Sequence, residues 1–142
     1  SFTQSWRLRS LSPVAMTSLT ATGEALWQQQ LVDARPEDFF KGLARHEAAG
    51  WAGTLSGAVS LVHETWFGGP VLTADRAGIL AALEKSGIDR NGAPIVSFCN
   101  TGHWAATNWF ALSELAGIDN VKLYPESMVG WTNAGKPVVT TE

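Results

Sequence analysis

Short apolar segments of β-type composition alternate with helix-type segments along most of this 142-residue chain. The expected strands are residues 31–34, 58–61, 94–98 and 121–124. Helix-type stretches and turn residues lie between them, which is typical of parallel strands joined by crossover helices. We therefore predict an α/β fold in which helices flank both faces of a parallel sheet.

The expected helices have recognisable start and stop signals. Pro36, followed by two acidic residues, is typical of a first helical turn, and Thr73 can cap a helix that Gly87 ends. Between residues 105 and 116 apolar side chains recur at spacings of 4, 3 and 4, so they line one face of a third helix. A short helix is expected over residues 127–131.

The composition is that of a globular domain. Hydrophobic residues make up 45% and charged residues 16% of the chain, and a domain of this size buries roughly 70% of the surface that its unfolded chain exposes. The net charge is −3 and neither Lys nor Arg forms a run, so we expect no nucleic-acid partner. No window approaches 18 consecutive apolar residues, so we expect no membrane segment.

Cys99 is the only cysteine, and it stands where the apolar run 94–98 gives way to a helix-type segment. A single cysteine excludes an internal disulfide, and the three histidines do not have the spacing of metal ligands. Backbone N–H groups at a helix N-terminus favour negative charge, and therefore the reactive thiolate. We interpret Cys99 as a nucleophile, with a buried and inert thiol as the alternative.

Three segments, in this order, resemble the rhodanese (sulfurtransferase) family: residues 31–35 (LVDAR), 53–59 (GTLSGAV) and 99–104 (CNTGHW). The closing part of the chain is similar to the family's final strand, turn, buried tryptophan and Gly-x-Pro: residues 121–124, Ser127, Trp131 and 135–137. The likeness extends over about residues 30–138. It implies a parallel sheet with the cysteine loop at the carboxyl ends of the strands, where open α/β sheets bind ligands.

The resemblance also implies a sulfur-transfer cycle. The Cys99 thiolate would take the outer sulfur from a donor such as thiosulfate, and the persulfide would pass it to a thiol or cyanide acceptor. Backbone N–H groups of the loop would stabilise the negative charge. We predict that Cys99 is catalytic and that substrate binding involves seven residues: Arg35, Asn100, Thr101, Gly102, His103, Trp104 and Ala105. No metal and no cofactor are expected.

The loop departs from the patterns of related enzymes. Cysteine phosphatases carry an arginine six positions after the nucleophile, where this chain has Ala105. Thiosulfate-using members carry a cation in or beside the loop, which Arg45 or His46 could supply from another segment. Mercaptopyruvate-type loops read Cys-Gly-Ser-Gly-Val-Thr, and this loop shares with them only Cys99 and Gly102. The physiological donor therefore stays open.

Several side chains near the loop have two interpretations. The resemblance to the rhodanese family implies that Asp33 and Arg35 form a pair that anchors the loop, with substrate contact as the alternative. Five others could border the pocket or serve ordinary packing, solvation and capping: Trp66, Trp104, His103, Ser127 and Met128.

We expect residues 1–20 to form an N-terminal segment or linker with an edge strand, and residues 21–142 to form the rhodanese-like domain. The first of these resembles the segment that precedes the second domain in tandem members of the family. The chain is therefore expected to be the C-terminal catalytic domain of such a protein, with a second rhodanese-like domain as a partner. The alternative function is a sulfur carrier or protein-binding module without turnover. The compartment, cytoplasmic or periplasmic, stays open.

Overall fold

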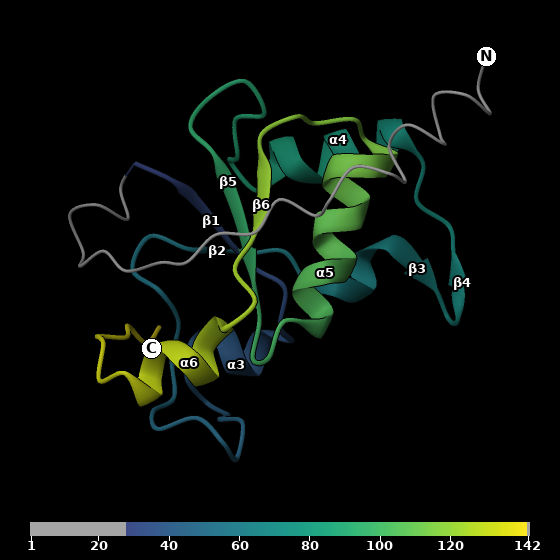
Figure 1. Cartoon of the computed structure of the whole chain (residues 1–142). Coiled ribbons are helices and arrows are strands. Elements are labelled where there is room, and N and C mark those ends of the chain that lie inside the picture. The colour runs from purple at the N-terminus through teal and green to yellow at the C-terminus, as the bar shows by residue number, and fades with distance from the viewer. Residues whose placement is uncertain (1–27, 142) are drawn as a thin grey trace.

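The computed structural model describes residues 28–141, so the segment expected over residues 1–20 lies outside the described residues (Figure 1). Four parallel strands form the central sheet in the order β2-β1-β5-β6. Their bounds are Gln30–Asp33 for β1, Val59–Ser60 for β2, Ile95–Phe98 for β5 and Val121–Leu123 for β6. The predicted parallel sheet is confirmed, and each strand overlaps its predicted segment.

The helical elements are α3 (Glu37–Lys41), η1 (His63–Trp66), α4 (Arg76–Lys85), α5 (His103–Trp109), η2 (Phe110–Leu115) and α6 (Ser127–Asn133). Side chains alternate between the two faces of a strand, so Val32 and Ile95 pack under α4, α5 and η2, while Leu31 and Val96 pack with α6. Helices thus flank both faces, as predicted. None of the helices among residues 28–141 is long and apolar enough to cross a membrane.

Two features of the middle of the chain differ from the sequence prediction. A small antiparallel hairpin, β3 (Phe67–Gly68) and β4 (Val71–Leu72), precedes α4. Two-residue strands are too short to show an alternating pattern, so the sequence did not predict it. The prediction that Thr73 caps α4 was wrong: the N-cap is Asp75, whose Oδ1 accepts the Gly78 N–H at 2.8 Å.

The helix predicted after Cys99 is present, but its second half is π-helical. From Phe110 onward the backbone widens, and the Ala116 N–H donates to the Ala111 carbonyl, five residues earlier, at 2.9 Å. The predicted apolar face is nevertheless buried: Ala105, Trp109, Leu112 and Ala116. This face holds α5 and η2 against the sheet and so fixes where α5 begins.

The strand order reverses between β1 and β5, because β1 connects to β2 on one side and β5 connects to β6 on the other. In open parallel sheets, ligands bind at the carboxyl ends of the strands beside such a reversal. The segments that follow β1 and β5 begin at residues 34 and 99. The fold therefore places the Cys99 loop at the expected ligand-binding edge.

Candidate active site around Cys99

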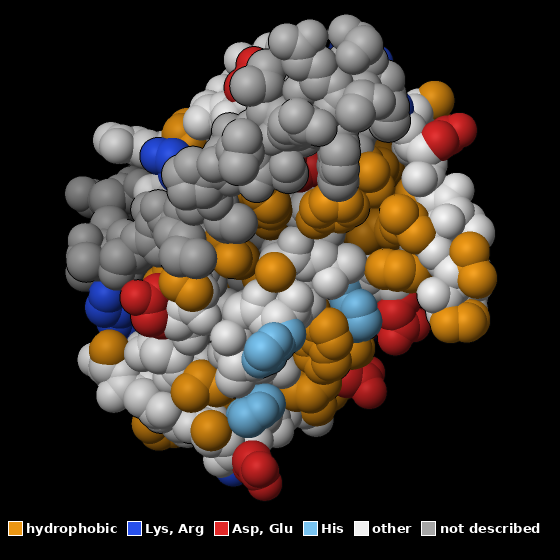
Figure 2. All heavy atoms as spheres, turned by 45° about the vertical axis from the view of Figure 1, so that its right-hand side comes forward, with side chains coloured by type: hydrophobic (Ala, Val, Ile, Leu, Met, Phe, Trp, Pro, Cys, Tyr) orange, Lys and Arg blue, Asp and Glu red, His pale blue; other side chains and the backbone are white. Residues whose placement is uncertain are grey.

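Cys99 follows β5 directly, and its residue surface is 1% exposed. Its side chain nevertheless borders a cavity of about 260 Å³, whose other lining residues are His46, Asn100, Thr101, His103 and Trp104. Figure 2 shows histidine and hydrophobic side chains gathered on one face of the molecule. Four of the seven predicted substrate-binding residues line this cavity, and their role in binding stays a prediction.

A backbone N–H reaches the sulfur of Cys99. The Gly102 N–H donates to Sγ at 3.0 Å, and the Gly102 carbonyl accepts the Ala106 N–H at 3.0 Å as α5 begins. Gly102 itself has φ +102°, a left-handed conformation that favours glycine. The loop therefore curls around the sulfur and presents a donor to it, which stabilises negative charge at that atom.

The start of α6 holds the backbone of the Cys99 loop. The Cys99 N–H donates to Ser127 Oγ at 3.0 Å. The Cys99 carbonyl accepts the Met128 N–H at 2.9 Å, and the Asn100 carbonyl accepts the Val129 N–H at 3.0 Å. Ser127 and Met128 are buried and support the loop from behind, so they do not line the cavity.

A buried ion pair holds the loop on its other side. Arg35 is 2% exposed and donates through Nε and Nη2 to the Asp33 carboxylate at 2.9 and 2.8 Å. Its Nη2 also reaches the Gly53 carbonyl at 2.8 Å, and its Nη1 reaches Asn100 Oδ1 at 3.3 Å. Thr54 Oγ1 donates to Asp33 at 2.8 Å. Arg35 thus lies behind the loop as an anchor and is not among the residues that line the cavity.

The loop between α3 and β2 contributes a histidine to the cavity. Arg45 turns back on its own loop and donates to the carbonyls of His46, Glu47 and Ala49. His46 lines the cavity, and its Nδ1 accepts the Ala48 N–H at 3.1 Å. Of the two residues that could supply the missing cation, the structure places His46 at the site and uses Arg45 to brace the loop.

Two aromatic contacts hold Trp104 at the cavity wall. The His63 imidazole stacks on the indole with ring centroids 4.7 Å apart, and Phe39 meets it edge-on at 6.2 Å. Trp66 has a different position: its Nε1 donates to Asn108 Oδ1 at 2.9 Å, and it borders a separate apolar groove. Of the two interpretations of Trp66, the structure therefore supports ordinary core packing. Nothing in the sequence singled out His63.

The comparisons with known proteins agree with this arrangement. The family model of the rhodanese-like domain matches residues 18–134. This chain belongs to the rhodanese-like domain family. The match covers most of the chain, and its residues include the Cys99 loop and its supports in β1 and α6.

One curated relative and two solved structures show how the rhodanese-like domain is used elsewhere. A thiosulfate sulfurtransferase of Corynebacterium glutamicum is 32% identical over 94% of this chain and 44% of its own length. The anaerobic ergothioneine biosynthesis enzyme of Chlorobium limicola, solved with trimethyl histidine, is 21% identical with a TM-score of 0.75, over 89% of this chain and 32% of that chain.

SseA of Escherichia coli, described as a 3-mercaptopyruvate sulfotransferase with a rhodanese fold, is 24% identical with a TM-score of 0.61, over 82% of this chain and 43% of that chain. The two solved structures share the rhodanese fold with this chain. This chain spans less than half the length of each of the three proteins. The second rhodanese-like domain expected as a partner therefore stays a prediction.

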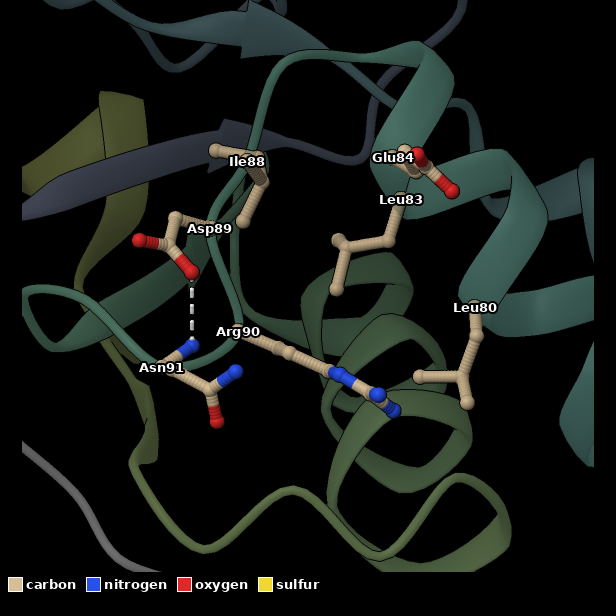
Figure 3. A pocket seen from close by; sticks show the side chains of 7 residues that line it. All are labelled: Leu80, Leu83, Glu84, Ile88, Asp89, Arg90 and Asn91. Carbon is tan, nitrogen blue, oxygen red and sulfur yellow. Dashed lines mark hydrogen bonds between the residues drawn. The ribbon is translucent and has the colours of Figure 1, made fainter.

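Another hollow of the rhodanese-like domain, of about 300 Å³, lies between the end of α4 and the turn over residues 88–91 (Figure 3). The Asn91 N–H donates to Asp89 Oδ1 at 2.9 Å, and the Arg90 side chain extends across the hollow towards Leu80. This turn precedes β5, so the hollow lies at the opposite end of that strand from Cys99. Its lining residues include no nucleophile, so it adds nothing to the candidate site.

Gly102→Ala is expected to destabilise the rhodanese-like domain by about 1–3 kcal/mol, because a non-glycine residue at this φ is strained. A Cβ at this position would also lie 3.0 Å from the Pro125 carbonyl oxygen. Denaturant unfolding measures the loss. Gly87→Ala is the matched control, since Gly87 also has a positive φ but a Cβ there would meet nothing within 4 Å. Equal losses of stability in Gly102→Ala and Gly87→Ala would contradict the proposed clash between a Cβ at position 102 and the Pro125 carbonyl oxygen.

His63→Phe is expected to make stability less sensitive to acid. His63 Nε2 is buried without a hydrogen-bond partner among residues 28–141, and Glu64 Oε1 lies 3.9 Å away. Burial lowers the pKa of His63 below 6.5, and Glu64 opposes this only in part. The unfolded chain therefore binds this proton more readily, and the free energy of unfolding falls as the pH drops from 6.5 through the folded-state pKa.

Phenylalanine keeps the stack on Trp104 and removes the titrating ring. Denaturant unfolding at a series of pH values should therefore show a smaller loss of stability on acidification in His63→Phe than in the unsubstituted domain. Parallel pH profiles would contradict a contribution from His63.

Proposed function

We propose that this domain transfers a sulfane sulfur from a donor such as thiosulfate to a thiol or cyanide acceptor through a persulfide on Cys99. The observation that carries the proposal is the environment of one atom. Cys99 Sγ borders a cavity and accepts the Gly102 N–H at 3.0 Å, at the start of a loop that hydrogen bonds hold from two sides. A nucleophile needs both access and a fixed position.

The reaction runs in two steps. In the first, the Cys99 thiolate attacks the outer sulfur of thiosulfate, a new S–S bond forms, and the old S–S bond breaks as sulfite leaves with the bonding electron pair. In the second, cyanide or a thiolate attacks the outer sulfur of the persulfide, and the Cys99 thiolate leaves. Each step replaces one sulfur bond by another, so no external oxidant or reductant is consumed. Ping-pong kinetics follow.

The structural supports suit an anionic intermediate. Thiolate and persulfide are both negatively charged, and a fixed backbone donor stabilises such charge without having to reorganise during the reaction. Four hydrogen bonds join Cys99 and Asn100 to Arg35 and to α6, and they leave the loop little freedom to move that donor away from the sulfur. A phosphatase activity lacks comparable support, because the position of the phosphate-clamping arginine is the buried Ala105.

A sulfur carrier without turnover is the alternative, since the same cysteine environment would hold a persulfide for a protein partner. Thiocyanate formed from thiosulfate and cyanide, measured per mole of protein, separates the two functions. Many equivalents are expected for the enzyme, and a single equivalent would support the carrier. No thiocyanate together with no sulfur on the protein would contradict the proposal.

A further inference from the structure

We infer that the preferred sulfur donor is an organic persulfide, in which the transferable sulfur is attached to a thiol of low molecular weight, and that His46 sets this preference against thiosulfate. The inference rests on the proposed function and specifies its donor. Its basis is the chemistry of the cavity wall, which offers imidazole and indole groups where a small dianion requires fixed positive charge.

No lysine or arginine is among the side chains that line the Cys99 cavity in the described part of the chain. The two arginines nearest to His46 in the sequence make other contacts. Arg35 is buried against Asp33 and also packs over the Phe39 ring, with Cζ 5.7 Å from the centroid. Arg45 donates to three carbonyls of its own loop. A sulfonate group would therefore enter the cavity without a guanidinium or ammonium partner, which makes its desolvation costly.

A backbone contact fixes which ring nitrogen of His46 can donate to a ligand. Because its Nδ1 accepts the Ala48 N–H at 3.1 Å, Nε2 is the ring nitrogen that is left to donate a hydrogen bond. The loop that carries it is tied to α6, since the Gly50 N–H donates to Thr132 Oγ1 at 3.0 Å and Asn133 Nδ2 donates to the Ala48 carbonyl at 2.9 Å. One fixed N–H suits a single acceptor atom better than a charged group with three oxygens.

Trp104 also favours an organic donor over thiosulfate. Its indole lines the cavity and is fixed between His63, at 4.7 Å, and Phe39, at 6.2 Å. A flat apolar wall of this kind gains free energy by covering the carbon atoms of a donor, and thiosulfate has none. The cavity volume of about 260 Å³ is large for thiosulfate and leaves room for an organic group.

The transfer step balances with this donor. The Cys99 thiolate attacks the outer sulfur of R–S–SH, so that a new S–S bond forms in Cys99–S–SH and the S–S bond of the donor breaks. The electron pair leaves with R–S⁻, which takes up a proton from solvent. The products are the same Cys99 persulfide and a free thiol, and no further reactant is consumed.

The test measures how fast Cys99 gains sulfur, by intact mass, from thiosulfate and from the persulfide of N-acetylcysteine methyl ester, whose organic part is uncharged. Each rate is divided by the rate of the same donor with a small free thiol, which removes differences in intrinsic reactivity. The unsubstituted domain is expected to favour the organic persulfide by about tenfold. His46→Arg is expected to raise the thiosulfate rate by about tenfold, the effect of one charge-assisted hydrogen bond, and to change the persulfide rate little.

Two variants serve as controls. His46→Gln keeps a neutral N–H donor and should keep the original preference. Leu43→Arg adds the same charge as His46→Arg at a 73% exposed position outside the cavity lining, so it should leave both rates unchanged. The inference would be overturned if the normalised rate were higher with thiosulfate than with the organic persulfide. It would also be overturned if His46→Arg left the ratio of these two rates unaltered. Either result would leave the proposed function in place. Failure of both donors to place sulfur on Cys99 would instead contradict the proposed function.

Discussion

Replacing Arg35 by methionine is expected to lower the free energy of unfolding by about 3–5 kcal/mol, the usual cost of removing one partner from a buried ion pair. Asp33 has no exposed surface, and in the variant its carboxylate would keep only the Thr54 hydroxyl and the backbone N–H of residue 35 as donors. A domain is commonly stable by about 5–15 kcal/mol, so this loss would bring the protein close to unfolding. Denaturant unfolding with a common slope measures it.

Two further variants show whether the ion pair causes the loss. Arg90→Met removes an exposed arginine from the turn beside β5 and is expected to change stability by less than about 0.5 kcal/mol. The double variant Asp33→Asn with Arg35→Met removes the unpaired charge and should recover part of the lost stability. An Arg35→Met domain that unfolds at the same denaturant concentration as the Arg90→Met domain would refute the anchoring role of Arg35.

Replacing Cys99 by serine is expected to reduce thiocyanate formation by more than about a thousandfold, as removal of a nucleophile does in other covalent mechanisms. The oxygen of serine cannot form the S–S bond on which both transfer steps depend. The fold should be kept, because a serine hydroxyl is similar in size to the thiol and can accept the Gly102 N–H that Sγ accepts at 3.0 Å.

Thermal unfolding of Cys99→Ser, measured beside its activity, separates chemistry from stability. We expect a melting temperature within a few degrees of that of the unsubstituted domain together with background activity, since a change of about 1 kcal/mol shifts it by only a few degrees. Turnover at the original rate would mean that the sulfur passes through the site without a cysteine persulfide. Loss of the folded state would mean that Cys99 has a larger packing role than its position at the cavity indicates.

The parts of the site that the sequence predicted correctly rest on local patterns. The buried strand β5, Cys99 directly after it and the start of α5 at His103 are consecutive in the chain, so periodicity and residue type suffice to place them. The Asp33 and Arg35 pair was instead expected from the resemblance to the rhodanese family, and the structure shows that its ion pair forms between residues separated by one position.

The parts that the sequence did not predict depend on partners distant in the chain. His63 meets Trp104 across 41 positions, and Ser127 meets Cys99 across 28. Neither contact leaves a pattern in a single sequence, since histidine and serine also occur in turns where they make no such contact. Ser127, the first residue of α6, also has φ 51°, a conformation that is unusual for a residue other than glycine.

Arg45 and His46, two neighbouring residues, show again that the sequence alone does not place a side chain at the site. Their place in the long loop before Gly50 indicated that either of these neighbouring residues could bring positive charge to the site. The structure distinguishes the two residues, because Nη1 of Arg45 donates to three carbonyls of the loop while His46 lines the cavity. Which side chain lines the cavity therefore depends on which one donates hydrogen bonds to the backbone carbonyls of the loop.

The mass of the intact domain, before and after exposure to a sulfur donor and again after cyanide, tests the central proposal most directly. Because Cys99 is the only cysteine in the sequence, a gain of sulfur can be assigned without ambiguity. We predict that the protein gains the mass of one sulfur atom, loses it to cyanide as thiocyanate, and shows neither change in Cys99→Ser. An unchanged mass with every donor, or an equal gain in the serine variant, would contradict the persulfide mechanism.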